Sequence, residues 1–420
     1  MSTSEDVQRD AGESAASIAD YQKGTVEAWE EQRRKPWQVY VDATLGFRNH
    51  WYPAFYSHEL READVSDAAG EPVANVKAMT LLGEAVICRR IGGKVHAVQD
   101  WCLHRGVPFS SRPECYTRET ITCWYHGFTY DLRNGDLTHV ITDPGCPLIG
   151  KIRLRTYPVI EAKGLVWIFV GDMDPPPPLE SDVPPGLLDD DFWVYPDGWS
   201  KVVACNWRPA AENGFDPAHA YIHRNSGLTT QYKVAFPFSE TGISKTRGME
   251  VVQSDTGPNG VKLLRGGADS VWEADVDGVK VATRYRPGEE GVFKSELPEV
   301  SMWLPSTLWV NPFPAPGVVH LEFYVPLDEN THCYMITWGT FVKSEEQRAQ
   351  FEEDVRTIWS DVVPNHFSNE DVFAREALHD FYANPDGWFR ERLFGPDVVI
   401  TTWRNMVSRA NRGVQRRGLQ

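Results

Sequence analysis

The chain has 420 residues, of which 41% are hydrophobic and 24% are charged, and its formal net charge is −17. A chain of this length can form two or three domains around a large buried core. The strong negative charge argues against a nucleic-acid partner, because phosphate binding needs clustered Lys and Arg side chains.

The N-terminal segment, residues 1–46, is predicted to be a tail with one helix at Tyr21–Gln32. Met1–Ser17 is polar and lacks the apolar core of a secretory signal. The longest apolar stretch near the middle, Leu165–Val170, is far shorter than the roughly 20 residues that a membrane helix needs. We therefore expect a cytoplasmic protein without a membrane partner.

Residues 47–172 have the pattern of short strands separated by turns. Apolar runs such as Ala85–Cys88 alternate with turn signals such as Gly92-Gly93 and Arg133–Asp136. This pattern is typical of a small antiparallel β domain.

Two short segments in this region carry metal-ligating side chains, Cys102-Leu103-His104 and Cys123-Trp124-Tyr125-His126. Two thiolates on one iron and two imidazoles on the other form the ligand set of a Rieske [2Fe-2S] cluster. A structural zinc site uses the same atoms. Zinc fingers usually have a cysteine pair followed by a histidine pair, whereas each half here is Cys-then-His, which favours the iron–sulfur cluster. The five other cysteines are scattered and odd in number, which is not typical of a disulfide framework.

A proline run at Pro175–Pro178 marks the expected domain boundary, and residues 173–420 are predicted to form a second domain. Val318–Val342 reads as an antiparallel hairpin, and Ser344–Val363 and Ser368–Tyr382 read as helices. Clustered strands with flanking helices indicate an α+β fold.

A second candidate metal site lies in the predicted second domain. Asp216, His219 and His223 are spaced i, i+3 and i+7, so on a helix they share one face. Two histidines and one carboxylate make a facial triad that leaves Fe(II) open to dioxygen. A histidine pair at this spacing is also common as a hydrogen-bonded surface pair. Asp216 is either the carboxylate or an outer partner of a metal-bound histidine, and it also fits a helix cap before Pro217.

Together these motifs resemble the oxygenase component of the Rieske non-haem iron oxygenases, over about Leu45–Arg412. The resemblance rests on Cys-x-His, Cys-x2-His, Asn-Trp-Arg and Glu-Asn-Gly-Phe-Asp-x2-His-x3-His. Phe47–Pro53, Cys123–His126 and Ala374–Ala377 are most similar to the branch of carbazole dioxygenase and 2-oxoquinoline 8-monooxygenase.

The resemblance implies a fold and a ligand set. It implies a small antiparallel β Rieske domain and a catalytic domain of helix-grip type, with an antiparallel sheet and flanking helices. The mononuclear Fe(II) would be bound by His219, His223 and a C-terminal aspartate, which matches Asp371. Glu370 is the neighbouring competitor, and Asp371 also fits a first-turn acid that favours the helix dipole near Ser368.

The resemblance also implies a route for electrons. No G-x-G-x-x-G or G-x4-G-K-[ST] nucleotide motif is present, so electrons must arrive from a partner. By resemblance this is a ferredoxin fed by an NAD(P)H-dependent reductase. Members of this branch are homotrimers, in which Asp216 would connect a histidine of the iron site with His126 of a neighbouring subunit.

The expected function is hydroxylation of a fused aromatic or N-heteroaromatic ring with O2 in the breakdown of aromatic hydrocarbons. Dioxygenation is the favoured prediction. A monooxygenase or an oxidative demethylase would use the same metal sites. Two alternatives come from other functional classes. A pure Rieske electron carrier would not need Asp371 as a metal ligand, and a zinc-stabilised interaction module would be a colourless protein.

Candidate substrate contacts are Gly214, whose missing side chain exposes its carbonyl beside the iron, and Phe367, with Phe215 and Phe373 as further apolar candidates. Each phenylalanine is equally compatible with the core, and Gly214 with a kink in a helix.

Overall fold

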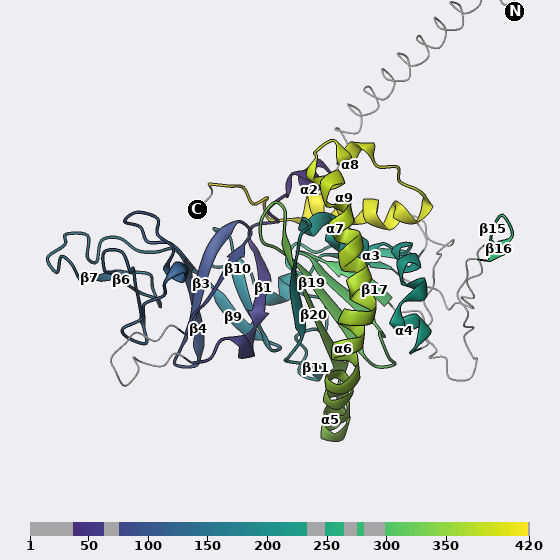
Figure 1. Ribbon diagram of the computed structural model, residues 1–420, viewed down its shortest axis with the longest axis horizontal. Coiled ribbons are helices and arrows are strands. Elements are labelled where there is room, and N and C mark those ends of the chain that lie inside the picture. Colours follow the sequence, from purple (N-terminus) through teal and green to yellow (C-terminus); the bar gives the residue numbers. More distant parts are fainter. Residues whose placement is uncertain (1–36, 63–74, 233–247, 264–274, 281–298, 419–420) are drawn as a thin grey trace, which may run out of the picture.

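The computed structural model describes residues 37–62, 75–232, 248–263, 275–280 and 299–418. The helix expected at 21–32 lies outside these residues. Figure 1 shows two parts side by side along the long axis. The N-terminal part consists of strands, whereas the C-terminal part has a large sheet covered by helices.

The N-terminal part contains three antiparallel sheets. The central one has the order β1-β10-β9, with Trp51 opposite Phe169 in the β1–β10 pair. Every residue of β10 is buried, which explains its uninterrupted apolar sequence. The second sheet has the order β2-β3-β4-β8 and the third β5-β6-β7. The strands are β1 His50–Tyr56, β2 Lys77–Leu81, β3 Glu84–Ile91, β4 Lys94–Gln99, β5 Thr120–Thr122, β6 Phe128–Asp131, β7 Leu137–Val140, β8 Thr156–Tyr157, β9 Val159–Ala162 and β10 Leu165–Val170.

The C-terminal part is built on one eight-stranded antiparallel sheet, in which β12 joins β20 beside the path β11-β20-β19-β18-β17-β14-β13. The predicted hairpin at Val318–Val342 is confirmed, because β19 and β20 pair over their whole shared length. The strands are β11 Phe192–Val194, β12 Trp199–Val203, β13 Met249–Val252, β14 Gly260–Leu263, β17 Glu299–Trp303, β18 Thr307–Asn311, β19 Val319–Pro326 and β20 His332–Phe341, and β15 Asp275–Val276 pairs separately with β16 Val279–Lys280.

Helices cover one face of this sheet (Figure 1). They bury a core that includes Trp207, Trp338 and Trp403, all almost inaccessible to solvent. The α-helices are α2 Gln38–Asp42, α3 Trp207–Phe215, α4 Gly227–Thr230, α5 Glu345–Asp354, α6 Ser360–Val363, α7 Asn369–Ala383, α8 Gly387–Arg390 and α9 Val398–Ala410.

The prediction of two separate helices around residue 364 is wrong. From α5 to α7 the backbone stays helical, because π-helical turns at Val355–Trp359 and Pro364–Ser368 connect the α-helical stretches. Proline lacks the N–H that would donate to the preceding turn, and a π turn accommodates it without ending the helix. Ser368 has helical dihedrals, so Asp371 does not lie at a free helix start, and the dipole argument for it fails.

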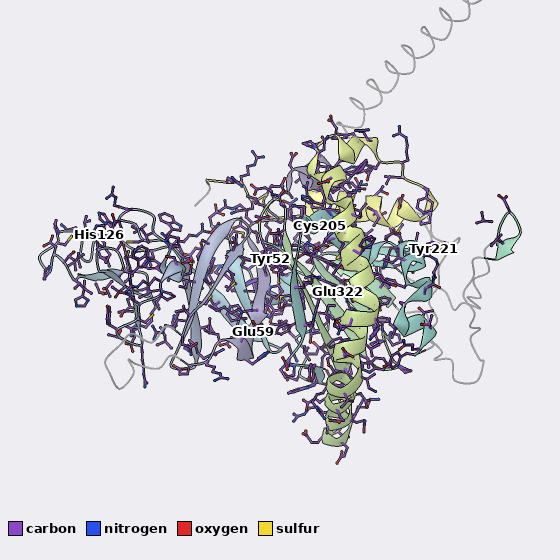
Figure 2. All side chains as sticks on the ribbon, in the orientation of Figure 1. Tyr52, Glu59, His126, Cys205, Tyr221 and Glu322 are labelled. Carbon is purple, nitrogen blue, oxygen red and sulfur yellow. The ribbon has the colours of Figure 1, made fainter. Side chains whose placement is uncertain are left out.

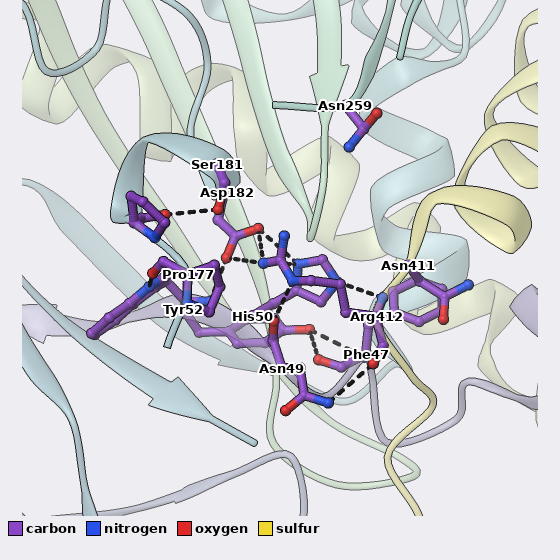
Figure 3. A network of polar contacts seen from close by, with 12 residues as sticks. Phe47, Asn49, His50, Tyr52, Pro177, Ser181, Asp182, Asn259, Asn411 and Arg412 are labelled. Atoms are coloured by element: carbon purple, nitrogen blue, oxygen red, sulfur yellow. Dashed lines mark hydrogen bonds and ion pairs between the residues drawn. The ribbon is translucent and has the colours of Figure 1, made fainter. Parts of the chain in front are cut away.

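A buried ionic cluster joins the two parts of the molecule (Figure 3). Asp182, fully buried, lies 2.8 Å from the ring Nδ1 of His50 and accepts a hydrogen bond from the backbone N–H of Trp51. Arg412, beyond α9, pairs with the same carboxylate and donates from Nε to the carbonyl of Asn49. Burial lowers the pKa of His50 despite the carboxylate beside it. These contacts connect the segment after α9 to β1, the first strand of the N-terminal part.

These sheets and helices confirm the predicted α+β fold class, with antiparallel sheets in both parts. The division at residues 172 and 173 remains a prediction. Among the described residues, no helix is long and apolar enough to cross a membrane.

Candidate metal centres

The four predicted cluster residues lie on two similar tight turns at the far end of the N-terminal part. Cys102 follows β4, and its carbonyl accepts a hydrogen bond of 2.9 Å from Gly106. Cys123 follows β5, and its carbonyl accepts a hydrogen bond of the same length from Gly127. Both glycines have φ +69°, a conformation that L side chains rarely adopt. The glycine two residues after His104 and the one directly after His126 therefore allow each loop to close.

The side chains of these turns face one another. The rings of His104 and His126 are 4.6 Å apart between centroids, while Cys102 and Cys123 are buried beneath them. Nδ1 of His126 is buried and has no hydrogen-bond partner among the described residues. Burial raises the pKa of the Cys102 thiol, and the Tyr130 hydroxyl lies 3.5 Å from its sulfur. Two buried cysteines on facing turns, beside an unpaired imidazole nitrogen, fit an iron–sulfur cluster.

The arrangement differs from a site for one ion. Among the residues that the structure describes, a compact group of three metal-ligating side chains occurs at His219, His223 and Asp371, and not at the cluster turns. A two-iron cluster with bridging sulfides spreads its four ligands further apart than a zinc ion does, and a compact single-ion group is not what these turns form.

The second centre brings together three residues that sequence analysis selected. His219 and His223 lie on a 3-10 helix, His219–Asn225, which follows the end of α3, and Asp371 lies on α7. His219 Nε2 is 3.6 Å from Asp371 Oδ1, and His223 Nε2 is 3.4 Å from Asp371 Oδ2. The three ligand atoms all lie within 4.8 Å of one another. The predicted shared helix face is wrong in detail, because α3 ends at Phe215, but the histidines still converge.

The outer nitrogens of both histidines contact oxygen atoms. Nδ1 of His219 contacts the backbone carbonyl of Asp216, and Nδ1 of His223 lies 2.8 Å from Oε2 of Glu370. An acceptor at Nδ1 holds the proton on that atom and leaves Nε2 available to a metal. The geometry therefore distinguishes the two competing carboxylates. Only Asp371 faces the Nε2 atoms that are available to a metal, whereas Glu370 lies at the outer nitrogen of His223.

The electrostatics of this centre suit a divalent cation. Burial favours a neutral acid at Asp371, but His223, Arg375 and His219 together hold its pKa well below the usual range. Burial likewise favours a neutral ring at His223, yet Asp371 and Glu370 raise its pKa to about 9. The buried Oδ1 of Asp371 accepts no hydrogen bond among the described residues. Two imidazoles and an ionised carboxylate around one point match the facial triad of Fe(II) oxygenases.

Asp216 is an outer partner of His219 through its backbone carbonyl and not through its carboxylate, and it caps a different helix end from the one expected. It caps the C-terminus of α3 rather than the N-terminus of a helix, with its N–H bonded to the carbonyl of Glu212. Its Oδ1 accepts a 2.7 Å hydrogen bond from the N–H of Ala218, while its backbone rather than its carboxylate contacts His219. Asp216 Oδ2 has no partner in the described part of this chain, which leaves it available to a group from outside.

A pocket opens next to the histidine–aspartate group. Gly214 and Phe367 both line it, as predicted, and Phe367 stacks on His223 with ring centroids 3.7 Å apart. Phe215 also lines it, but Phe373 is 76% exposed and lies outside, so that candidate is wrong. Sequence analysis missed the wall that comes from β17, β18, β19 and the loop after β18, which are distant in sequence, namely Val300, Leu308, Val310, Phe313, His320 and Glu322.

The structure explains why residue 214 is a glycine, which the sequence did not. A Cβ at this position would lie 1.7 Å from the hydroxyl oxygen of Tyr324 and 3.3 Å from Leu308. The glycine thus makes room for a tyrosine of β19 behind the pocket. No kink of α3 is needed to explain it.

The two metal centres lie far apart in one chain. Figure 2 shows His126 near one end of the long axis, whereas Glu322, which lines the catalytic pocket, lies within the other part. The sheets β1-β10-β9 and β2-β3-β4-β8 stand between them (Figure 1).

Comparison with known proteins gives consistent matches to both parts. Residues 50–158 match the Rieske [2Fe-2S] domain, and residues 169–415 match the homotrimeric ring hydroxylases. The terminal oxygenase component of carbazole 1,9a-dioxygenase from Metapseudomonas resinovorans is 43% identical over 389 residues, covering 91% of this chain and 96% of the relative. The counterpart from a Sphingomonas species is 42% identical over 92% and 97%.

Solved structures agree with these matches. The terminal oxygenase of carbazole 1,9a-dioxygenase from Novosphingobium sp. KA1 superposes with a TM-score of 0.83 at 40% identity, covering 93% of this chain and 99% of that one. The oxygenase in a reduced oxygenase–ferredoxin complex of carbazole 1,9a-dioxygenase gives a TM-score of 0.82 at 41% identity, covering 94% and 98%.

Proposed function

The chain belongs to the homotrimeric ring hydroxylases, the Rieske-type terminal oxygenases, and we propose that its substrate is a fused N-heteroaromatic compound of the carbazole type, which it dioxygenates. Membership of the family confirms the predicted enzyme class, with its Rieske [2Fe-2S] cluster and mononuclear iron. The substrate and the roles of individual residues are the parts that we propose.

The pocket beside His219, His223 and Asp371 carries this proposal. Its walls are mainly apolar, and Phe313 and Phe367 pack together there with centroids 5.3 Å apart. Aromatic rings bury large apolar areas and pack well against such side chains. The relatives that share more than 40% of the sequence are named for carbazole. A flat multi-ring substrate therefore suits the pocket better than a small polar acid.

Each metal group has a proposed set of ligands. Cys102, His104, Cys123 and His126 would hold the Rieske cluster, and His219, His223 and Asp371 would hold the mononuclear iron. When bound, the cluster supplies single electrons and the iron activates dioxygen for attack on the ring.

The protein's own side chains prepare this site. Asp216 and Glu370 hold the outer nitrogens of the two histidines, which keeps both Nε2 atoms directed inward. Phe367 and the other apolar walls exclude water from the place where the substrate lies, which strengthens electrostatic interactions there.

We also propose that electrons cross between subunits of a trimer. The two centres of one chain are separated by the central sheets, whereas Asp216 Oδ2 is free to accept a hydrogen bond from outside. His126 lies at the far tip (Figure 2), and with its buried Nδ1 directed to the cluster its Nε2 would be the nitrogen that donates to a neighbouring subunit. A head-to-tail arrangement would bring His126 of one subunit to Asp216 of the next. In this arrangement residues 47–172 act as the electron-accepting domain and residues 173–420 as the catalytic domain.

The electron donors are proposed to be a ferredoxin and an NAD(P)H-dependent reductase. Relatives with TM-scores of 0.82 have been solved as complexes with ferredoxin. A supply of NAD(P)H places the system in the cytoplasm, where it would take part in the breakdown of aromatic compounds.

Turnover with a surrogate ferredoxin and reductase tests the proposal. Carbazole, a methoxylated benzoate and a sterol should be offered separately, with NADH consumption and product measured for each. We expect product from carbazole and none from the other two, and no product with an Asp371→Ala control. Demethylation of the benzoate without attack on carbazole would assign the chain to the oxidative demethylases instead.

A further inference from the structure

One wall of the catalytic pocket is polar, although it is almost completely buried. His320 and Glu322 of β19 line it at 1% and 4% exposure, and Arg375 of α7 lines it with no exposed surface at all. Val310 and Phe313 beside them are apolar. Buried charges in an apolar pocket are costly unless they are paired and hydrogen-bonded, so the arginine calls for an explanation.

Arg375 lies on the same helix face as a proposed metal ligand. It follows Asp371 by four residues on α7, and side chains at this spacing lie one above the other on a helix. Both residues line the pocket, together with His219 and His223. The guanidinium therefore shares the pocket with the three proposed iron ligands.

Three other elements hold the guanidinium in place. Its Nε donates a 2.6 Å hydrogen bond to Oδ1 of Asn213 on α3. Its Cζ lies over two parallel rings, 5.0 Å from the centroid of Tyr324 on β19 and 4.2 Å from that of Tyr334 on β20. A cation is attracted to the face of an aromatic ring. Arg375 thus brings a positive charge to a fixed position in the pocket.

One nitrogen of this guanidinium has no partner in the protein. Nη2 lies 3.4 Å from the Tyr324 hydroxyl and 3.6 Å from Oε2 of Glu322. In contrast, Nη1 of Arg375 is buried and has no hydrogen-bond partner among the described residues. Arginine stays protonated, so Nη1 can only donate. A buried donor that is left unpaired is costly, and a ligand that accepts from it would remove this cost.

Glu322 is the counter-charge of Arg375. Besides facing the guanidinium, it accepts a hydrogen bond from the Tyr324 hydroxyl, and Nε2 of His320 lies 2.8 Å from its Oε1. Hydrogen bonds to a carboxylate and a cation beside it favour its ionised form. Glu322 therefore offsets part of the positive charge that Arg375 presents to a ligand.

From this arrangement we infer that Arg375 is a catalytic residue, whose Nη1 donates hydrogen bonds to the oxygen that becomes negatively charged when dioxygen is reduced in the pocket. Dioxygenation combines the ring, O2, two electrons and two protons into a dihydroxylated product, and the ferredoxin supplies the electrons. Negative charge develops on oxygen until both protons have been added. A fixed donor directed at this charge stabilises it without reorganisation. The inference rests on the proposed iron ligands and not on the identity of the aromatic substrate.

Azide, a small anion, is the probe for this site. Its Kd is measured at pH 8 from the EPR signal of the ferric mononuclear iron, because the oxidised Rieske cluster gives no signal. We expect Arg375→Met to bind azide about tenfold more weakly than the wild type, and Glu322→Gln to bind it about threefold more tightly, because the first removes a positive charge and the second a negative one. Arg375→Lys keeps the charge and should stay close to the wild type.

The opposite directions separate this role from a structural one, because a contact that only supports the fold would weaken azide binding in either variant. Iron content and Rieske absorption should be unchanged in all three variants. Equal azide affinity of the wild type and Arg375→Met would overturn the inference. So would weaker or unchanged binding in Glu322→Gln, which decides the question if Arg375→Met does not fold. Failure to attack carbazole, with the expected azide affinities, would contradict the proposed substrate and support the role of Arg375.

Discussion

Glu370 and Asp371 are adjacent in the chain, yet they contact opposite nitrogens of one histidine. Glu370 Oε2 lies 2.8 Å from Nδ1 of His223, and Asp371 Oδ2 lies 3.4 Å from its Nε2. Successive residues of an α-helix point in directions about 100° apart, so α7 can present two carboxylates to two sides of the same ring. We therefore propose that Asp371 binds the metal and that Glu370 orients its histidine ligand.

The first prediction separates these two roles. Asp371→Ala should lose the mononuclear iron and all product, because it removes a ligand, and it should retain the Rieske EPR signal. Glu370→Gln keeps an acceptor for His223 and should retain iron with an affinity lowered by about 10-fold to 100-fold. Iron per protomer, measured after dialysis, checks both variants. Loss of iron in Glu370→Gln alone would reverse the assignment.

The second prediction concerns Asp216. Asp216→Asn keeps the size of the side chain but loses its charge, so it should retain both metal centres and still accept electrons into the cluster. Electron transfer onward should slow by more than tenfold, seen as a reduced cluster that stays reduced when carbazole and dioxygen are added. Normal reoxidation in this variant would mean that Asp216 only caps α3.

Mixing two variants tests whether this transfer crosses an interface. Trimers that combine Asp216→Asn with the cluster-deficient His126→Ala should regain activity where an intact cluster meets an intact Asp216. Mixtures that stay as inactive as each parent would contradict a bridge between subunits.

The third prediction concerns the ionic cluster that joins the two parts of the molecule. Asp182→Ala leaves Arg412 and His50 without their buried carboxylate, and breaking a buried pair costs about 3 kcal/mol. Asp172→Ala is the matched control, because Asp172 is 72% exposed and pairs with Arg48 at 3.4 Å. An exposed pair contributes about 0.5 kcal/mol. Thermal unfolding should show a much lower Tm for Asp182→Ala only. Equal Tm values for the two variants would contradict a stabilising role of this ionic cluster.

The fourth prediction concerns pH. Burial lowers the pKa of His332 to about 3, with a hydrogen bond to the Cys205 carbonyl opposing the shift. The unfolded chain binds a proton at this ring below about pH 6.5 and the folded chain does not. The stability that His332 contributes is therefore complete above pH 6.5 and falls as the pH decreases, by about 1 kcal/mol between pH 6.5 and 5.5.

His332→Asn can still donate to Cys205 but cannot titrate, so its Tm should depend less on pH over this interval. His139→Gln, at an exposed histidine of β7, should keep the wild-type slope. A wild-type slope in His332→Asn would show that this ring does not govern the acid sensitivity.

Local patterns were sufficient to select the cysteine and histidine candidates for the metal ligands and to predict the hairpin β19–β20, whereas Asp371 was selected from the family resemblance. The pairs Cys102–His104 and His219–His223 are short-range motifs, and the alternation of β19 is visible along the chain. The continuous helix from α5 to α7 was not predictable, because Pro364 normally ends a helix and only the π turn accommodates it. Neither was the polar wall of the pocket, since a single histidine in a buried strand reads as core until its neighbours are known.

Asp216 and Gly214 show the same limit. Both were selected from a motif, but their local roles depend on contacts that the motif does not contain. The close approach of Tyr324 to Gly214 joins α3 to a strand more than a hundred residues later. The end of α3, in contrast, has a local cause, because Asp216 precedes Pro217 and has an extended ψ of 118°.

Turnover of carbazole under 18O2 tests the central claim most directly. The wild-type protein, with a ferredoxin and a reductase, should give an initial product that contains two labelled oxygen atoms from one dioxygen molecule, as dioxygenation requires. Product with a single labelled atom would show monooxygenation, and an oxidised ferredoxin without any labelled product would show an electron carrier; either result would contradict the account.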